Sequence, residues 1–326
     1  MKLDYIVVGL GLAGIAFAEE LLKASKSFIV YEDESQKSSI VAGGVYNPVI
    51  LKRYTPVWNA KEQLELAMPF YENLELKLNQ SFDKKFTTKK VFKSIEDQNN
   101  WFTAIDKPKL APFLDPNLDS EKYKGIIADF KLGNVKETGK LDTKLLVNAY
   151  RKYLKEKNLV RSDSFEYNYV KVKETKIVYK DIQADKVVFA EGYGVYQNPF
   201  FNYLPLQGTK GELITIHAPE LKINFLLKST VFVLPIGNNY YRIGATFNHT
   251  DKTSKPTKEG KQELIEKLEK VIDVPYTITE QVAGVRPTVS DRKPLVGVHP
   301  KHQNLAILNG LGTRGVMIAP SMAKEL

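Results

Sequence analysis

The sequence predicts an α/β protein, mixed α and β overall, that combines a parallel sheet with a mostly antiparallel one. Three observations predict this class. The chain opens with a buried strand, a glycine-rich turn and a helix over residues 5–23, and it ends with the same order of elements over 305–326. Between these ends, residues 76–138 and 203–250 are rich in short β-like runs separated by turns. Such runs are typical of antiparallel sheets.

The opening strand and turn have the pattern of a dinucleotide-binding site. Residues 5–8 are a short apolar run, as expected of a strand covered on both faces. Gly9, Gly11 and Gly14 then fit G-x-G-x-x-G, which permits a tight turn, the approach of a pyrophosphate and close helix–strand packing. Residues 15–23 continue as a helix whose free N–H groups would face the phosphates. A Rossmann-like domain is therefore predicted, and the alternative is a glycine-rich turn without a ligand.

An acidic residue follows at the expected distance. Residues 28–31 form a second apolar strand that ends at Glu32 and Asp33. Glu32 lies eighteen residues after Gly14 (32 − 14), close to the roughly twenty expected of the carboxylate that binds an adenosine ribose. We expect Glu32 in that role, with Asp33 as the second candidate.

The next segments are assigned by their turn residues and periodicity. Residues 36–58 contain serines, glycines and prolines, and they are predicted to form an ordered loop, either against a flat ligand or as a plain crossover. Residues 59–75 have helical periodicity. Residues 76–138 lack it and are predicted to belong to the antiparallel sheet. Trp58 and Trp101 are expected in the core.

A capped helix and three strands come next. Asp142 is a plausible N-cap for a helix that continues to Tyr153. Strands are predicted at 165–170, 175–179 and 186–190. The last of these strands runs into Ala190, Glu191 and Gly192. The small residues Ala190 and Gly192 at a strand end are typical either of a second cofactor-binding edge of the sheet or of an ordinary strand terminus.

The C-terminal half of the chain contains further antiparallel strands and then a second strand, glycine-rich turn and helix. Predicted elements are strands at 212–216, 230–234 and 240–246, a hairpin turn at 235–239 and an amphipathic surface helix at 257–272. A buried strand at 305–308 then leads into the glycine-rich turn 310–316 and a last helix. The start of this helix would point its dipole at the same ligand as the first helix.

Composition narrows the classes of function. The chain has 326 residues, no cysteine and a net charge of +9. The lack of cysteine excludes disulfides, thiolate metal sites and a cysteine nucleophile, and the four histidines show no metal-ligand spacing. Without an apolar run of about twenty residues or a secretory signal, a cytoplasmic protein with no membrane segment is expected. The charge, densest at the lysines of 84–93, suits either a soluble lysine-rich surface or a nucleic-acid partner.

Six motifs along the chain match one known family in its order. They are V-V-G-L-G-L-A-G at 7–14 with Glu32, A-G-G-V-Y-N-P at 42–48, A-E-G at 190–192, L-P-I-G-N-N-Y-Y-R-I-G-A-T at 234–246, G-V-R-P-T-V-S-D-R-K-P-L-V-G at 284–297 and G-L-G-T-R-G-V-M-I-A-P at 310–320. Together they resemble the D-amino-acid/glycine oxidase (DAO) superfamily of FAD enzymes. The last motif most resembles the oxidase half of the tRNA wobble-uridine methylaminomethyl-biosynthesis enzyme, whereas R-P after G-V most resembles the amino-acid oxidases.

The resemblance implies FAD held by a discontinuous domain. That domain would comprise residues 1–50, 139–202 and 284–326, and a substrate domain with a mostly antiparallel sheet would comprise 51–138 and 203–283. The implied FAD-binding residues are Gly9, Leu10, Gly11, Leu12, Ala13, Gly14, Glu32, Asp33, Ser39, Gly43, Gly44, Val45, Val170, Ala190, Glu191, Gly192, Gly310, Leu311, Gly312, Thr313, Arg314, Gly315 and Val316. Val170 would contact adenine through its backbone, and residues 310–316 would wrap the isoalloxazine. The flavin should be non-covalent, because cysteine is absent and no histidine precedes His217.

The resemblance also implies three catalytic positions. Arg286 matches the family arginine that binds the substrate carboxylate, a task suited to a planar guanidinium; the alternative is a structural arginine at a domain seam. The family places a tyrosine hydroxyl beside that arginine, and the corresponding residue here is Phe232. Tyr46 is a candidate to replace the lost donor, as are Tyr54 and Tyr241.

These inferences predict an FAD-dependent oxidase or dehydrogenase that acts on CH–NH groups. It would oxidise the C–N bond of a small amine or amino-acid-like substrate, such as an N-substituted glycine, through hydride transfer to flavin N5. Water would hydrolyse the imine, and a neutral amine would need no general base. Two alternatives stay open: the same chemistry on a modified tRNA wobble uridine, and a flavin-binding protein without catalysis.

Overall fold

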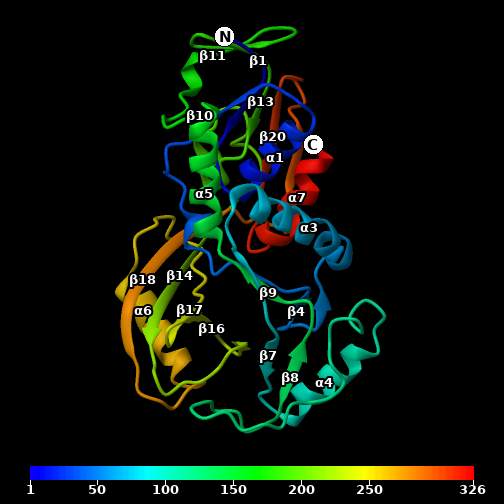
Figure 1. Cartoon of the computed structure of the whole chain (residues 1–326), viewed down its shortest axis with the longest axis vertical. Helices are drawn as coiled ribbons and strands as arrows, with labels where there is room; N and C mark the ends of the chain where they lie inside the picture. Colours follow the sequence, from blue (N-terminus) through cyan, green and yellow to red (C-terminus); the bar gives the residue numbers. More distant parts are fainter.

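The computed structural model describes residues 1–326 and contains two large sheets, which lie at opposite ends of the molecule in Figure 1. The first sheet has eight strands, and β1 and β13 at its centre are parallel. In sheet order these strands are β10 (Val160–Arg161), β2 (Phe28–Tyr31), β1 (Lys2–Val8), β13 (Ile182–Phe189), β12 (Ile177–Tyr179) and β11 (Val170–Val172), while β20 (Leu305–Asn309) pairs with β13 and β19 (Leu295–Val298) pairs with β20. Both β2 and β20 are fully buried, as their continuous apolar runs predict.

Helices surround this first sheet. They are α1 (Leu12–Lys23), α3 (Ala60–Leu78), α5 (Thr143–Glu156) and α7 (Gly315–Glu325). A Cβ at Gly14 would lie 2.0 Å from the carbonyl oxygen of Gly9, so only glycine allows α1 to begin this close to β1. Helix α7 packs against α1 and α3, which brings the first and last helices of the chain side by side. Asp142 caps α5 as predicted, by accepting a hydrogen bond of 3.0 Å from the amide of Leu145.

The second sheet has seven strands and is mostly antiparallel. Its order is β18 (Thr277–Arg286), β14 (Thr209–His217), β17 (Tyr240–Gly244), β16 (Phe232–Gly237), β15 (Leu226–Lys228), β7 (Thr88–Val91) and β8 (Leu132–Val135), and only the β15–β7 pair is parallel. The turn between β16 and β17 has positive φ at Asn238 and Asn239, which is typical of a tight hairpin and confirms the predicted one. Helix α6 (Lys258–Leu268) packs on β14 and β17.

Short elements connect the two sheets. A three-stranded sheet is formed by β3 (Val45–Tyr46), β9 (Gly139–Leu141) and β6 (Asp83–Lys85), and a two-stranded one by β4 (Val49–Ile50) and β5 (Thr55–Pro56). The remaining helices are α2 (Ser38–Val41), α4 (Ile95–Ile105) and two 3-10 turns at Tyr167–Tyr169 and Gly192–Gln197. None of the helices has the length and hydrophobicity that crossing a membrane requires.

Four local predictions are wrong. Residues 36–58 are not simply a loop, since they contain α2 and strands β3 to β5, each held to two to four residues by the neighbouring turn residues. The region 76–138 contains the helix α4 as well as strands. Residues 165–169 form no strand, because β11 begins only at Val170. Trp58 is 52% exposed, whereas Trp101 is fully buried as expected.

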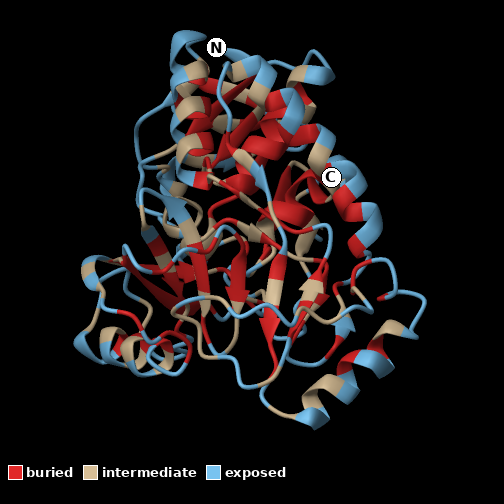
Figure 2. Cartoon of the chain, turned by 60° about the horizontal axis from the view of Figure 1, so that its bottom comes forward, coloured by how far each residue is buried: buried red, intermediate tan, exposed pale blue.

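Burial follows the two-sheet arrangement. In Figure 2 the buried residues are concentrated in the strands and in the inner sides of the helices, and the exposed ones lie on loops and outer helix faces. The predicted class, α/β with a mostly antiparallel second sheet, is confirmed. The division into domains stays a prediction, and β18 runs through the border proposed between residues 283 and 284.

Candidate active site

A cavity of about 460 Å³ is lined by residues of both large sheets. On the first sheet it meets the carboxyl ends of the strands, with Val8 on β1, Tyr31 on β2 and Asn309 on β20. On the second sheet it meets β14, β16 and β18. Ligands of open α/β sheets bind at the carboxyl ends of the strands, so this cavity is the candidate active site.

The N-terminal glycine-rich turn forms one wall of the cavity. Gly9 has a φ of +97°, and Gly11 precedes α1 without a side-chain cap. A Cβ on Gly11 would meet only Ser39, whose Oγ would lie 3.0 Å away, so the rest of its surroundings is open. Ser39 Oγ also accepts a hydrogen bond of 3.3 Å from the amide of Leu12. An uncapped helix start of this kind offers amide N–H groups and a positive dipole end to an anion.

Glu32 lines the cavity beside this turn, and its role toward a ribose stays a prediction. Its Oε2 accepts a hydrogen bond of 2.7 Å from the amide of Leu10, and its Oε1 accepts one of 2.9 Å from Glu34. Arg151 on α5 lies 3.5 Å from the same Oε1. Burial raises the pKa of Glu32, against the opposing effect of these hydrogen bonds and of Arg151. Asp33, the second candidate for the ribose, also lines the cavity.

The C-terminal glycine-rich turn forms the neighbouring part of the cavity wall. Asn309 is buried at the end of β20 and donates a hydrogen bond of 2.9 Å from Nδ2 to the carbonyl of Gly192. Its Oδ1 accepts one of 2.8 Å from Gly310, which has a φ of +72°. Helix α7 then begins at Gly315, again without a side-chain cap, and Gly315 lines the cavity. Two uncapped helix starts therefore meet one cavity, as the sequence predicts.

The end of β13 adds an acidic group. Glu191 is buried, and it accepts hydrogen bonds of 2.5 Å from the Tyr167 hydroxyl and 2.8 Å from Asn198. Burial raises the pKa of Glu191 to about 7, although both hydrogen bonds oppose the change. Ala190 and Gly192 line the cavity beside it.

Arg286 projects from the end of β18 into the cavity wall as a cation without an anionic partner. Its only protein hydrogen bond goes from Nη1 to the carbonyl of Thr246 at 3.3 Å, and the ring of Phe247 lies 4.7 Å from its Cζ. A Cβ on Gly211 would lie 1.9 Å from Nη2, so the neighbouring strand must carry glycine there. Burial lowers the pKa of Arg286 to about 10. The guanidinium is thus held in place by backbone and an aromatic ring, with its charge left for a ligand.

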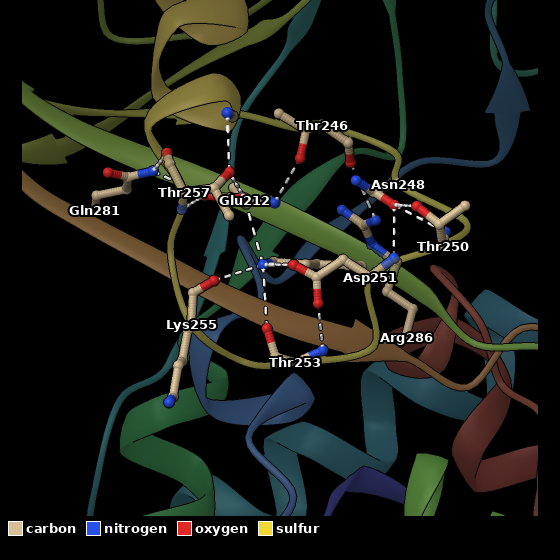
Figure 3. Close-up of polar contacts among 12 residues, drawn as sticks. Glu212, Thr246, Asn248, Thr250, Asp251, Thr253, Lys255, Thr257, Gln281 and Arg286 are labelled. Atoms are coloured by element: carbon tan, nitrogen blue, oxygen red, sulfur yellow. Dashed lines mark hydrogen bonds and ion pairs between the residues drawn. The ribbon is translucent and has the colours of Figure 1, made fainter.

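The loop that holds Arg286 is fastened to β14 by a second buried cation. Figure 3 shows the polar contacts of the segment from Thr246 to Thr257. Within this segment Asp251, Thr253 and Lys255 each accept a hydrogen bond from the ammonium group of Lys210. Lys210 Nζ lies 2.5 Å from both Asp251 Oδ2 and the carbonyl of Lys255, and 3.6 Å from Glu212. Because this charge is compensated, Lys210 positions the loop and is not free for a ligand.

The three tyrosines expected near Arg286 do not reach the cavity. Tyr46 donates a hydrogen bond of 2.9 Å to Asp83, Tyr54 donates one to Asp97, and Tyr241 donates one to the carbonyl of Leu221. None of them lines the cavity. The prediction that Tyr46 could replace the missing hydroxyl is therefore wrong for this structure, because its hydroxyl is committed to Asp83. Phe232 does line the cavity, and its ring contacts Gly43 and Gly244.

Most of the predicted cofactor residues come together. Those that line the cavity are Gly9, Leu10, Gly11, Leu12, Ala13, Glu32, Asp33, Ser39, Gly43, Gly44, Val45, Ala190, Glu191, Gly192, Leu311, Gly312, Thr313, Gly315 and Val316. Gly14, Gly310 and Arg314 do not line the cavity. Gly14 packs against Gly9, Gly310 adjoins Val289 and Leu295, and Arg314 donates a hydrogen bond to the carbonyl of Arg292. Val170 is not part of the cavity wall. In this segment the residues that line the cavity come earlier in the sequence, namely Ser164, Phe165 and Tyr167.

Sequence reasoning missed several charged and polar residues of this site. Arg151 falls four residues after Val147 and three before Leu154, both buried on α5, so an arginine within an apolar stripe was the available signal. Asn309 ends an apolar strand directly before a glycine, which was a weaker signal. Lys228 lines the cavity from β15, a strand that the sequence did not predict, and no local pattern singled it out.

The arrangement suits a dinucleotide. The two free helix starts can bind a pyrophosphate and a polar ring edge, Glu32 can accept hydrogen bonds from a ribose, and Gly11 leaves room for close approach. Arg286 adds a place for an anionic group of a second ligand. The fold and the site together define a dinucleotide-binding enzyme.

Comparison with known proteins agrees with this class. The family model described as FAD dependent oxidoreductase (DAO) matches residues 4–326, so the chain belongs to this family of FAD-dependent oxidoreductases. Glycine oxidase of Bacillus licheniformis is 22% identical over 360 residues, covering 100% of this chain and 92% of that protein. The tRNA 5-methylaminomethyl-2-thiouridine biosynthesis bifunctional protein MnmC of Idiomarina loihiensis is 26% identical over 153 residues, which are 44% of this chain and only 25% of that protein. In fold, iminodiacetate oxidase from Chelativorans sp. BNC1 matches with a TM-score of 0.78 at 16% identity, over 98% of this chain and 93% of its own.

Proposed function

We propose that the protein oxidises the C–N bond of a small amine that carries a carboxylate, such as an N-substituted glycine, to an imine that water hydrolyses. The observation that carries this proposal is Arg286, a partly buried guanidinium without an anionic partner in the same cavity as both glycine-rich turns. A carboxylate would accept two parallel charge-assisted hydrogen bonds from it. Such binding would fix the reacting carbon in one orientation.

The family's cofactor is FAD, which supplies the two-electron acceptor when it is bound. We assign its pyrophosphate to the amides of Gly11 and Ala13, which have no hydrogen-bond acceptor in the protein, its ribose to Glu32, and its ring system to residues 43–45 and 311–316. These assignments are supported by the cavity wall and by the two uncapped helix starts. We further propose that the flavin is non-covalent, because the chain has no cysteine and no histidine lines the cavity.

Phe232 favours a substrate with a substituent on its amine nitrogen. It lines the cavity and offers a ring without a hydroxyl, so the carboxylate of the substrate would rely on Arg286 alone. An apolar ring packs well against the substituent of a substituted amine but gives a bare glycine nothing to bind. This favours an N-substituted glycine over a simple free amino acid.

A second candidate is the same oxidation on a modified tRNA wobble uridine. It is favoured by the partial match to MnmC and by the net charge of +9. Affinity for tRNA that falls steeply with salt would support it, whereas turnover of free amines would support the first candidate. A flavin protein without catalysis remains the outcome if neither occurs.

Anaerobic titration of the holoenzyme with glycine, N-methylglycine and N-carboxymethylglycine tests the proposal. At least one substituted amine should bleach the flavin absorbance. Arg286→Leu should weaken its apparent affinity by about 30-fold or more, because removing one partner of a buried charge pair costs about 2–5 kcal/mol. Arg286→Lys should retain part of the affinity.

The matched control is Arg161→Leu, since Arg161 is exposed on β10 and lies outside the cavity. It should leave the titration unchanged. Wild-type affinity in Arg286→Leu would remove Arg286 from the site. A flavin that dithionite reduces but no amine reduces would contradict the catalytic proposal itself.

A further inference from the structure

Lys228 is a second cation of the cavity without an anionic partner. It ends β15 and lines the same cavity as Arg286. The nearby lysines are compensated, Lys90 by Asp97 and Lys267 by Glu263, but Lys228 forms no ion pair and its ammonium group has no hydrogen-bond acceptor in the protein. Burial lowers the pKa of Lys228 to about 8, and the charges of Lys90, Lys267 and Lys93 act in the same direction. The surrounding protein thus makes this position more positive instead of neutralising it.

The strand register places Lys228 and Arg286 on one face of the second sheet. Lys228 lies opposite Phe232, Phe232 opposite Gly244, and Gly244 opposite Leu213. Directly paired residues of neighbouring strands share a face. Leu213 in turn lies opposite Val282, four residues before Arg286 on β18. Alternation along the strand therefore puts Arg286 on the same face.

Between the two cations the residues on this face of the sheet have no side chain or an apolar one. Gly244 and Phe232 lie between β18 and β15, and Phe232 lines the cavity. The guanidinium of Arg286 reaches the carbonyl of Thr246, two residues beyond Gly244 at the end of β17. From β17 to β15 is two strand spacings, about 10 Å. The wall thus has a cation at each end and a hydrophobic middle.

Two uncompensated cations in one partly closed cavity repel each other and lose hydration, so each favours an anion from outside the protein. A substrate with a single carboxylate would neutralise only Arg286. The turn at Gly9 and Gly11, to which we assign the pyrophosphate, follows a strand of the first sheet, whereas Lys228 lies on the second sheet, so we do not assign the pyrophosphate to Lys228.

We propose that Lys228 binds a second anionic group of the amine substrate, so that the substrate is an N-substituted glycine whose substituent ends in a carboxylate. This rests on the function proposed above and narrows its substrate class. Arg286 would hold the glycine carboxylate, Lys228 the distal carboxylate, and Phe232 would pack against the chain between them. Lys228 would then determine specificity without taking part in the oxidation.

The test compares substrates of similar length with and without the distal charge. Steady-state rates of the holoenzyme would be measured for N-carboxymethylglycine and N-(2-carboxyethyl)glycine, and for N-ethylglycine and N-propylglycine. Wild type should prefer the charged member of each pair. Lys228→Met should lower kcat/KM for the charged amines by at least 30-fold, mainly through KM, and change it for the uncharged amines by less than threefold. Lys228→Arg should restore part of the preference.

Lys93→Met is the matched control, because Lys93 is exposed, contributes to the same local field and does not line the cavity. It should leave the preference unchanged. Equal losses for charged and uncharged amines in Lys228→Met, or no loss at all, would overturn the proposal. A loss confined to tRNA affinity would assign the second anion to a nucleic-acid phosphate and would also overturn it.

A binding measurement separates this proposal from the catalytic one. Glutarate and butyrate would be titrated into the oxidised holoenzyme, and the perturbation of the flavin spectrum would give their Kd. Glutarate should bind more tightly to wild type, and Lys228→Met should abolish this difference. If no amine reduces the flavin but the difference is present and depends on Lys228, the oxidation is wrong and the two-anion site stands. If amines are oxidised but the difference is absent, the two-anion site is wrong.

Discussion

Among the single residues of the cavity wall, Glu191 combines burial with hydrogen bonds that cannot fully compensate a charge. Tyr167 and Asn198 both donate to it, yet burial still raises its pKa to about 7. A carboxyl group with a raised folded-state pKa favours folding in its neutral form. Its contribution is complete below the ordinary pKa of 4.5 and is lost as the pH rises through about 7.

Replacing Glu191 tests this contribution. Between pH 5 and pH 8 the unfolding temperature of the wild-type holoenzyme should fall, because ionising Glu191 costs about 3 kcal/mol for a shift of about 2.5 pKa units. Glu191→Gln should flatten this slope, and the measurement is a thermal melt at a series of pH values. Glu174→Gln, at an exposed bend, should keep the wild-type slope. An unchanged slope in Glu191→Gln would mean that Glu191 is ionised throughout.

Single residues of the site differ in how far the sequence alone can predict their role. Glu32 could be proposed because it follows the glycine-rich motif at the expected spacing, and Arg286 because the residues around it resemble a motif of a known family. Lys228 could not, since its role comes from a register that aligns β15, β16, β17 and β14. Tyr46 was misassigned because its distance from Asp83 depends on the pairing of β3, β9 and β6.

At the scale of elements, the loop from Thr246 to Thr257 is the part of the second sheet that positions Arg286. It is tied to β14 through Lys210, which is fully buried. Its opposite end is tied through Glu212, which accepts hydrogen bonds from Thr257 and Gln281 (Figure 3). The position of Thr246 and Phe247 over the guanidinium therefore depends on charges outside the cavity.

Lys210→Met should loosen this loop. Breaking a buried ion pair costs about 3 kcal/mol or more, so the free energy of unfolding should fall by about that amount. The KM for a carboxylated amine should rise with little change in kcat, because Arg286 would lose its fixed orientation. Asp251→Asn should cost less, since Asp251 is only partly buried and Lys210 would keep Glu212. Denaturant unfolding and steady-state kinetics measure both; unchanged KM in Lys210→Met would separate the loop from the site.

Elements with strong local signals could be predicted, and those that depend on pairing could not. The capped helix α5 and the hairpin of β16 and β17 follow from Asp142 and from the two asparagines of the turn. Helix α4 carried a signal that was overlooked: Ser94 accepts a hydrogen bond of 3.1 Å from the amide of Asp97, a capping pattern visible as S-x-x-D. The two-residue strands β3 to β5 have no such signal, because only their partners define them.

At the scale of the whole molecule, the two ends of the chain build one site. Helix α7 packs against α1, so the turns that precede these helices face the same cavity although they are some three hundred residues apart. The sequence supports this arrangement because both ends repeat strand, glycine-rich turn and helix. It does not predict how the second sheet covers the cavity, since that depends on the long-range pairing of β14 with β18.

A titration of the deflavinated protein with FAD tests this arrangement most directly, using one variant from each end of the chain. Gly11 precedes α1 and Gly315 begins α7, both line the cavity, and neither has a positive φ. A Cβ on Gly11 would meet only Ser39, and one on Gly315 would lie 3.3 Å from Leu12 Cδ1, so both alanine variants should fold. The account predicts one FAD per chain, with Gly11→Ala and Gly315→Ala each raising its Kd about tenfold or more at nearly unchanged apoprotein stability. Wild-type affinity in either variant, or more than one FAD per chain, would show that the two turns do not share a ligand.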